Sequence, residues 1–86
     1  MRQHRAYYID SENNYSFVGY VADAAEASKM LKEILTKKNF KCYYTRMWIA
    51  ENKKYGFLLK YDFGSWSEFF AVQFESHEEA HRFLLE

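Results

Sequence analysis

The chain has 86 residues, among them eight Phe, eight Tyr and two Trp, with no Pro and three Gly. This length favours a single domain over residues 1–86, because chains divide into separate cores only at larger sizes. Twelve basic residues balance twelve acidic ones, so bulk charge indicates neither a general polyanion-binding protein nor an acidic DNA mimic.

The sequence also predicts where the protein resides. Cys42 is the single cysteine, so no internal disulfide can form, and we expect it to be a small hydrophobe on a strand rather than a nucleophile. Residues 1–10 lack the apolar core of a signal peptide, and no stretch has the length of a membrane span. We therefore expect a cytoplasmic protein without membrane contact or cofactor, either a monomer or a homodimer.

The first predicted element is a β-hairpin. Residues 5–9 and 15–21 are strand-like runs rich in Tyr, Val and Phe. Most residues between them, 10–14, have short polar side chains that favour a tight connection. We expect two antiparallel strands joined by this turn.

A helix is predicted next, over residues 24–38. Asp23, followed three residues later by Glu26, forms a variant of the capping box that begins helices. Apolar residues then recur at helical spacing, and Asn39 is a residue type that commonly ends a helix. The expected apolar face consists of Ala27, Met30, Leu31, Ile34 and Leu35.

From residue 40 to residue 75 the apolar residues recur at the period of two that is typical of strands. Breaks at 51–53 and 64–65 divide this stretch into three strands, which predicts an antiparallel meander. The first strand has apolar residues on both sides, so we expect it to be central or covered twice. In the second and third strands one side should face the core and the other should be mostly solvated. The expected core side holds Tyr55, Phe57, Leu59, Tyr61, Phe63, Trp66, Phe70, Val72 and Phe74.

The chain ends in a short predicted helix. Ser76 and Glu79 form a capping box ahead of Ala80, Phe83 and Leu84, which share one helix face. The whole pattern predicts an α+β fold of order ββαβββα, in which an antiparallel sheet is made of the N-terminal hairpin and the three-stranded meander. Both helices are expected on one face of that sheet.

Residues 77–81, His-Glu-Glu-Ala-His, match the H-E-x-x-H pattern of zinc metalloproteases. In proteins of that kind a third ligand follows further along the chain, whereas only five residues follow His81. The capping box also gives Glu79 a structural role. We interpret His77 and His81 as residues at the edge of the core, with an incidental or oligomer-bridging metal site as the alternative. No other catalytic group is indicated, so we expect no enzyme.

One stretch resembles part of a nucleic-acid-binding family. Residues 69–74, Phe-Phe-Ala-Val-Gln-Phe, and the helix start at 76–80 resemble the third strand and second helix of an RNA recognition motif. The resemblance implies that Phe69 stacks on a base. The stretch departs from the family at 67–68, where Ser and Glu replace a basic residue and Gly, and at Ala71, which replaces a second stacking aromatic.

The distribution of lysines also supports binding of nucleic acid as an alternative function. Residues 29–60 carry nine Lys or Arg and two Glu, a local charge of +7. Aromatic rings beside cations make a platform for RNA or single-stranded DNA. Solvated lysines at the ends of elements are the simpler interpretation. The lysines of this platform are Lys37, Lys38, Lys41, Lys53 and Lys54.

We favour a protein-binding module that acts as an inhibitor or adaptor. Tyr, Trp, Met and Arg are enriched at the centres of protein interfaces, and several of them lie together in the first meander strand. A sheet edge, either the N-terminal hairpin or the last meander strand, offers a second docking mode. Small proteins of this kind are common products of phages and mobile elements, where they disable host enzymes or defence nucleases. The expected contact residues are Tyr43, Tyr44, Arg46, Met47, Trp48 and Phe69.

Overall fold

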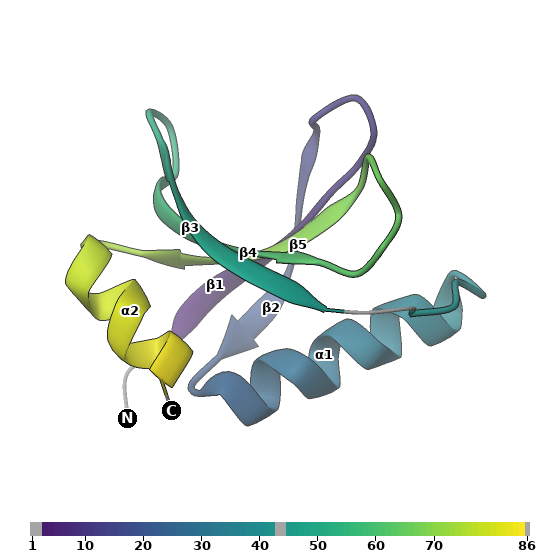
Figure 1. The fold of residues 1–86 in the computed structure, drawn as a ribbon, viewed down its shortest axis with the longest axis horizontal. Helices are drawn as coiled ribbons and strands as arrows, with labels where there is room; N and C mark the ends of the chain where they lie inside the picture. Colours follow the sequence, from purple (N-terminus) through teal and green to yellow (C-terminus); the bar gives the residue numbers. More distant parts are fainter. Residues whose placement is uncertain (1–2, 43–44, 86) are drawn as a thin grey trace.

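The computed structural model describes residues 3–42 and 45–85. It contains one five-stranded antiparallel sheet with both helices on the same face (Figure 1), which confirms the α+β fold of order ββαβββα. Tyr43 and Tyr44 lie outside the described residues. The elements are β1 His4–Ile9, β2 Tyr15–Val21, α1 Ala24–Lys37, β3 Arg46–Asn52, β4 Gly56–Asp62, β5 Phe69–Phe74 and α2 His77–Leu85.

The strands lie in the order β2-β1-β5-β4-β3. The last meander strand, β5, therefore pairs with β1 on one side and with β4 on the other. Val72 of β5, for example, lies between Ala6 of β1 and Leu59 of β4. Two expectations are wrong as a result. β5 is a central strand and offers no free edge, and β3, expected to be central or covered twice, is an edge strand together with β2.

The main core lies between the sheet and the helices. Every second residue of the central strands faces it, as the alternation predicts, and α1 and α2 contribute one apolar face each. Packing the aliphatic and aromatic side chains away from water supplies most of the stability of such a domain. The buried residues of this core are Ala6, Tyr8, Val21, Ala27, Leu31, Leu35, Leu59, Tyr61, Phe63, Phe70, Val72, Phe74, Ala80 and Phe83.

Capping groups set the helix ends. The Asp23 carboxylate accepts a hydrogen bond of 2.9 Å from the backbone N–H of Glu26, and the Glu26 carboxylate accepts one of 2.7 Å from Ala22. The first bond satisfies an N–H group that the first helical turn leaves open, and the second ties the residue before the N-cap to the helix. At the other end Asn39 has a positive φ of 55°, as expected for a residue that ends a helix. Ser76 Oγ accepts from the N–H of Glu79 at 3.1 Å and caps α2.

Two predictions about the start of the meander, for residue 40 and for Cys42, are wrong. Residue 40 was expected to begin that strand, but β3 begins at Arg46. The N–H of Phe40 instead donates to the carbonyl of Leu35 at 2.9 Å, and its ring packs at 5.4 Å from that of Phe63. Cys42 lies in the connection after α1 and is exposed, so its expected place on a strand is also wrong.

Two aromatic residues at the turns leave the predicted core side. Tyr55 packs on the sheet face opposite the helices, because Gly56, with φ of 80°, bends the chain at the β3–β4 turn. Trp66 lies in the connection between β4 and β5 with φ of 76° and is 92% exposed. Alternation holds only within a regular strand, so it fails at these two turns.

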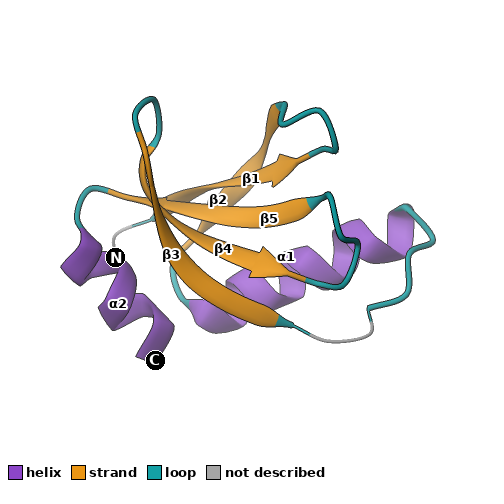
Figure 2. Cartoon of the chain, turned by 45° about the horizontal axis from the view of Figure 1, so that its top comes forward, coloured by secondary structure: helices purple, strands orange, loops and turns teal. Residues whose placement is uncertain are grey.

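The sheet is strongly bent. Both the β1–β2 and the β3–β4 hairpins rise away from the helices toward their turns (Figures 1 and 2). The face opposite the helices, called the open face below, therefore lies between two raised hairpins. Neither helix covers it.

Candidate binding site on the open sheet face

The middle of the open face is a row of five side chains, one from each strand. The pairing register places Trp48 opposite Lys60, Lys60 opposite Ala71, Ala71 opposite Tyr7, and Tyr7 opposite Phe17. We call these residues the central row. Ala71 is fully buried, so the small residue lies low between the larger Lys60 and Tyr7.

The alternation predicted that the open face would be mostly solvated, and that prediction is wrong. Ile9 and Leu58 are buried there with Ala71, beneath the half-buried rings of Tyr55 and Phe69. A second, smaller apolar cluster thus covers the back of the sheet. The rings of this cluster are only partly shielded from water. Sequence periodicity does not reveal a cluster of this kind.

Aromatic contacts join the two hairpins above this cluster. The rings of Tyr15 and Tyr55 stack with centroids 4.3 Å apart and planes 14° apart. Tyr7 meets both rings edge-on, at 6.0 Å and 5.0 Å. Asn52 Nδ2 donates to the Tyr15 hydroxyl at 3.4 Å. Such ring pairs contribute about 0.5–1.5 kcal/mol each beyond the area that they bury, so the two turns support one another.

A chain of hydrogen bonds fixes the centre of the face. Arg5 Nε donates to the Tyr7 hydroxyl at 3.0 Å, and this hydroxyl donates to Gln73 Oε1 at 3.1 Å. Gln73 Nε2 in turn donates to the backbone carbonyl of Tyr55 at 2.7 Å. Because each group holds the next, these side chains are ordered before any partner binds.

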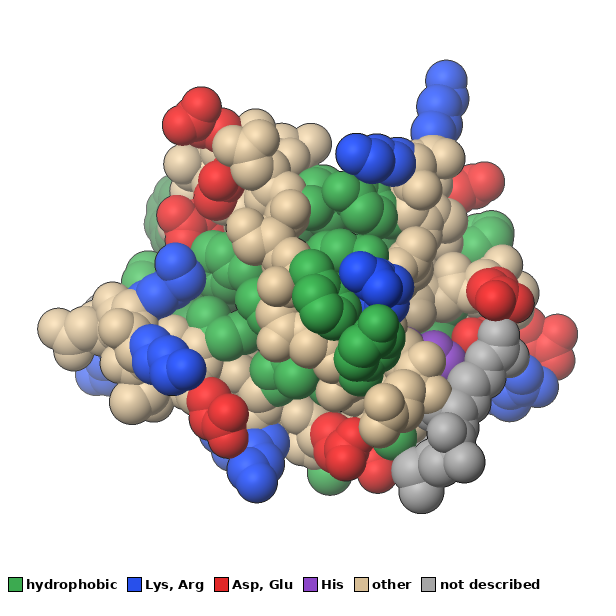
Figure 3. All heavy atoms as spheres, turned by 180° about the vertical axis from the view of Figure 1, so that it is seen from behind, with side chains coloured by type: hydrophobic (Ala, Val, Ile, Leu, Met, Phe, Trp, Pro, Cys, Tyr) green, Lys and Arg blue, Asp and Glu red, His purple; other side chains and the backbone are tan. Residues whose placement is uncertain are grey.

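Arg5 lies against aromatic rings. Its guanidinium lies 4.3 Å from the centroid of the Phe17 ring, and Nη1 donates to the Tyr20 hydroxyl at 3.1 Å. The hydrogen bond to Tyr7 raises the pKa of Arg5 above its already high ordinary value, so the group stays charged. In the view from behind, hydrophobic side chains gather in the middle of the molecule with Lys or Arg side chains against them (Figure 3).

A second cation lies at the other side of the central row. Lys60 Nζ is 4.8 Å from the ring centroid of Phe69 and 6.0 Å from that of Trp48. The two rings meet edge-to-face at 5.8 Å. Attraction between a cation and ring faces is worth about 0.5–1 kcal/mol at exposed positions, enough to bias the lysine toward the rings.

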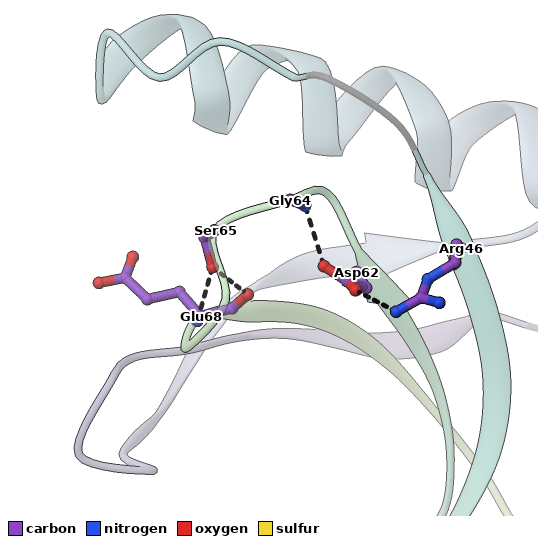
Figure 4. A network of polar contacts seen from close by, with 5 residues as sticks. All are labelled: Arg46, Asp62, Gly64, Ser65 and Glu68. Carbon is purple, nitrogen blue, oxygen red and sulfur yellow. Dashed lines mark hydrogen bonds and ion pairs between the residues drawn. The ribbon is translucent and has the colours of Figure 1, made fainter.

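The third basic residue of the face is paired with an acid. Arg46 Nη2 lies 3.2 Å from Asp62 Oδ2, and Asp62 Oδ1 accepts from the N–H of Gly64 at 2.9 Å (Figure 4). Ser65 Oγ accepts from the N–H of Glu68 and donates to its carbonyl, both at 2.6 Å. These bonds fix the connection between β4 and β5 beside the open face.

The structure brings together part of the predicted contact set. Arg46, Trp48 and Phe69 lie on the open face, whereas Met47 lies on the opposite side of β3, the side on which Ile49 packs against the main core. The predictions for Tyr43 and Tyr44 fall outside the described residues.

Sequence reasoning missed Arg5, Tyr7, Phe17 and Lys60. The sequence did hold a signal for two of them. Arg5 and Lys60 each alternate with core residues along a strand, which predicts that both lie on the face opposite the core.

The lysines of the nucleic-acid alternative lie in two separate places. Lys37, Lys38 and Lys41 are at the end of α1 and in the connection after it, and Lys53 and Lys54 are at the β3–β4 turn. Figures 1 and 2 show these two regions at opposite ends of the molecule. The structure therefore does not join the five lysines into one surface.

The H-E-x-x-H residues lie on α2. The rings of His77 and His81 are parallel with centroids 6.4 Å apart, and His77 also meets Phe57 edge-on at 6.3 Å. Within residues 3–42 and 45–85 no three His, Cys, Asp or Glu side chains gather as a metal site. The described part of the chain also holds no helix with the length and apolar character needed to cross a membrane.

No protein family, curated protein or solved structure matches the chain.

Proposed function

We propose that this protein is a non-enzymatic binding module that docks another protein on the open face of its sheet and acts as an inhibitor or adaptor. The observation that supports the proposal is the central row: aromatic rings and a cation held in fixed positions on a face that no helix covers.

The residue types on this face suit a protein interface. Trp, Tyr, Phe and Arg are enriched at interface centres, where they supply large contact areas. The hydrogen bonds from Arg5 through Tyr7 to Gln73 hold the face in place. A partner that meets ordered side chains has less conformational entropy to remove, which favours binding.

Ring contacts distinguish a protein partner from single-stranded nucleic acid. A base that stacks needs a free ring face. Here Lys60 lies over Phe69, Arg5 lies over Phe17, and Tyr15 and Tyr55 stack on each other. A cation or another ring thus already occupies one face of each of these four rings, which favours a protein surface over a row of bases.

β3 offers a matched pair of variants for a test. Trp48 and Met47 are neighbours with similar exposure, 38% and 44%, but they lie on opposite sides of the strand. Immobilised protein is incubated with nuclease-treated lysate of the source organism, and captured proteins are identified by mass spectrometry. We expect Trp48→Ala to lose the specific captured protein and Met47→Ala to keep it.

Equal capture by both variants would refute docking on the open face. Capture that disappears on nuclease treatment for the unsubstituted protein would instead indicate nucleic acid. Melting temperatures of both variants must stay close to that of the parent for the comparison to hold.

A further inference from the structure

The chemistry of the partner can be deduced from the cations of the open face. Resting on the proposed function, we infer that the docking segment of the partner is an extended acidic stretch whose carboxylates bind Arg5 and Lys60.

Arg5 and Lys60 carry charge that the described chain does not neutralise. In residues 3–42 and 45–85 neither has a carboxylate within ion-pair distance, and their contacts are rings and tyrosine hydroxyls. Rings displace water from one side of each cation, so an incoming carboxylate replaces less hydration than it would at a fully solvated lysine. A charge in this state favours an anionic partner.

Acids are scarce on this face. Among the described strands, Asp62 is the one acidic residue at an open-face position, and its side chain is already paired with Arg46. Glu75, directly after β5, lines a pocket together with Arg5 but is not within ion-pair distance of it. The neutral total charge of the chain therefore hides a locally basic face. A basic patch with aromatic residues selects a partner of opposite charge and apolar side chains.

The positions of the two cations suggest a spacing for the carboxylates. β4 and β1 flank β5, so Lys60 and Arg5 are two strands apart, about 10 Å. Arg5 is also two residues along β1 from Tyr7, which shares the row of Lys60, about 7 Å. The diagonal between the two backbone positions is about 12 Å, close to the ~13 Å between residues four apart on one side of an extended chain. The guanidinium of Arg5 lies over Phe17 of β2, on the side of β1 away from Lys60.

This spacing places an apolar residue midway between the two acids. The midpoint of the diagonal lies on β5 between Ala71, which is opposite Lys60, and Gln73, the next open-face residue of that strand. The half-buried rings of Tyr55 and Phe69 form an apolar cluster there. The expected motif is therefore Glu-x-apolar-x-Glu in an extended segment, with the two intervening residues facing away from the sheet.

The test uses Trp48 as a reporter. Trp66 is the second of the two Trp residues, so Trp66→Phe leaves Trp48 as the single tryptophan, inside the proposed site. The emission of this variant is titrated with a synthetic peptide containing Glu-Ser-Leu-Ser-Glu, with the same peptide carrying Gln for both Glu, and with short oligo(dT). We expect a saturable change with the acidic peptide and at least about tenfold weaker binding of the Gln peptide.

Variants locate the binding. Lys60→Gln should weaken the acidic peptide at least about tenfold, whereas Lys32→Gln, an exposed lysine on α1 away from the open face, should leave it unchanged. Equal binding of the Gln peptide, no effect of Lys60→Gln, absence of binding, or binding of oligo(dT) alone would each overturn the inference. If the peptide fails while Trp48→Ala still abolishes partner capture, docking on the open face stands and only recognition of carboxylates falls.

Discussion

The ring of Tyr15 stacks on the ring of Tyr55 and thereby joins the turns of two hairpins that are separated by a whole helix along the chain. The turns are raised on the open side of the sheet, and no backbone hydrogen bonds connect β2 with β3 or β4. Side-chain contacts therefore couple the two turns: the ring stacking and the hydrogen bond from Asn52 to the Tyr15 hydroxyl. Both rings also rest on Tyr7, so the curvature of the sheet and the order of the central row depend on one another.

A double-mutant cycle measures this coupling. Tyr15→Ala, Tyr55→Ala and the double variant are unfolded with urea, and the free energies of unfolding are compared. We expect the double variant to be less destabilised than the sum of the single variants by about 0.5–1.5 kcal/mol, because the pair is lost only once. A control cycle of Tyr55 with Phe40, which packs on Phe63 instead, should be additive; strict additivity for both pairs would contradict the coupling.

Tyr55 also shows where sequence reasoning ended. Alternation assigned Phe57, Leu59, Tyr61 and Phe63 to the core correctly, since each lies in or directly after a regular strand. It misplaced Tyr55 because the positive φ of the next residue changes the side to which the chain points. Local patterns thus predicted the elements and their order but not the aromatic cluster of the open face, which forms from turns distant in the sequence.

Asp62 should matter more to stability than its ion pair does. Arg46 is 71% exposed in its side chain and Asp62 only 10%, and the carboxylate also accepts the N–H of buried Gly64. Asp62→Ala leaves that N–H without its acceptor and should cost about 1–3 kcal/mol of unfolding free energy. Arg46→Ala removes an exposed pair and should cost less than about 1 kcal/mol.

Asp62→Asn separates the two roles of the carboxylate. Asn keeps an oxygen for the N–H of Gly64 and removes the charge, so its cost should be close to that of Arg46→Ala when measured by urea unfolding. If Asn and Ala were equally destabilising at this position, the charge and not the hydrogen bond would be the main contribution.

The position of β5 could not be read from the sequence. Its residues predict a strand after β4, and nothing local indicates that β1 pairs with its other side. Because β5 is inserted between β1 and β4, residues of opposite ends of the chain meet in the central row, Tyr7 beside Ala71 and Ala71 beside Lys60. The pairing of strands that are distant in the sequence depends on the burial of whole sheet faces. Short-range periodicity carries no information about that burial.

Alkaline pH should destabilise the fold through Tyr61. Burial raises the pKa of this phenol from 10.0 to about 12. Below about pH 10 Tyr61 is neutral in both states and its contribution is constant. Between about pH 10 and 12 the unfolded chain loses the proton while the folded chain keeps it, so the free energy of unfolding falls, by about 2–3 kcal/mol in total for this group.

Tyr61→Phe supplies the check. Urea unfolding at a series of alkaline pH values should show a shallower fall in stability for the variant than for the parent. Burial and the hydrogen bond to Glu68 also raise the pKa of Tyr8, so part of the pH dependence should remain. Identical slopes for parent and variant would show that Tyr61 ionises equally in both states.

The side chain of Met30 on α1 lies close to Gly19 of β2. A Cβ atom built there would lie 2.8 Å from Cε of Met30, and Gly19 has φ of 144°, a conformation that other residues rarely adopt. Gly19→Ala should therefore lower the free energy of unfolding by about 1–3 kcal/mol, mainly through backbone strain, with a smaller cost for moving the end of the flexible Met30 side chain. In a Met30→Ala background the clash is gone, so the same substitution should cost less but still destabilise. A loss of equal size in both backgrounds would attribute the whole effect to the backbone, and no loss in the parent would contradict the close packing of α1 on β2.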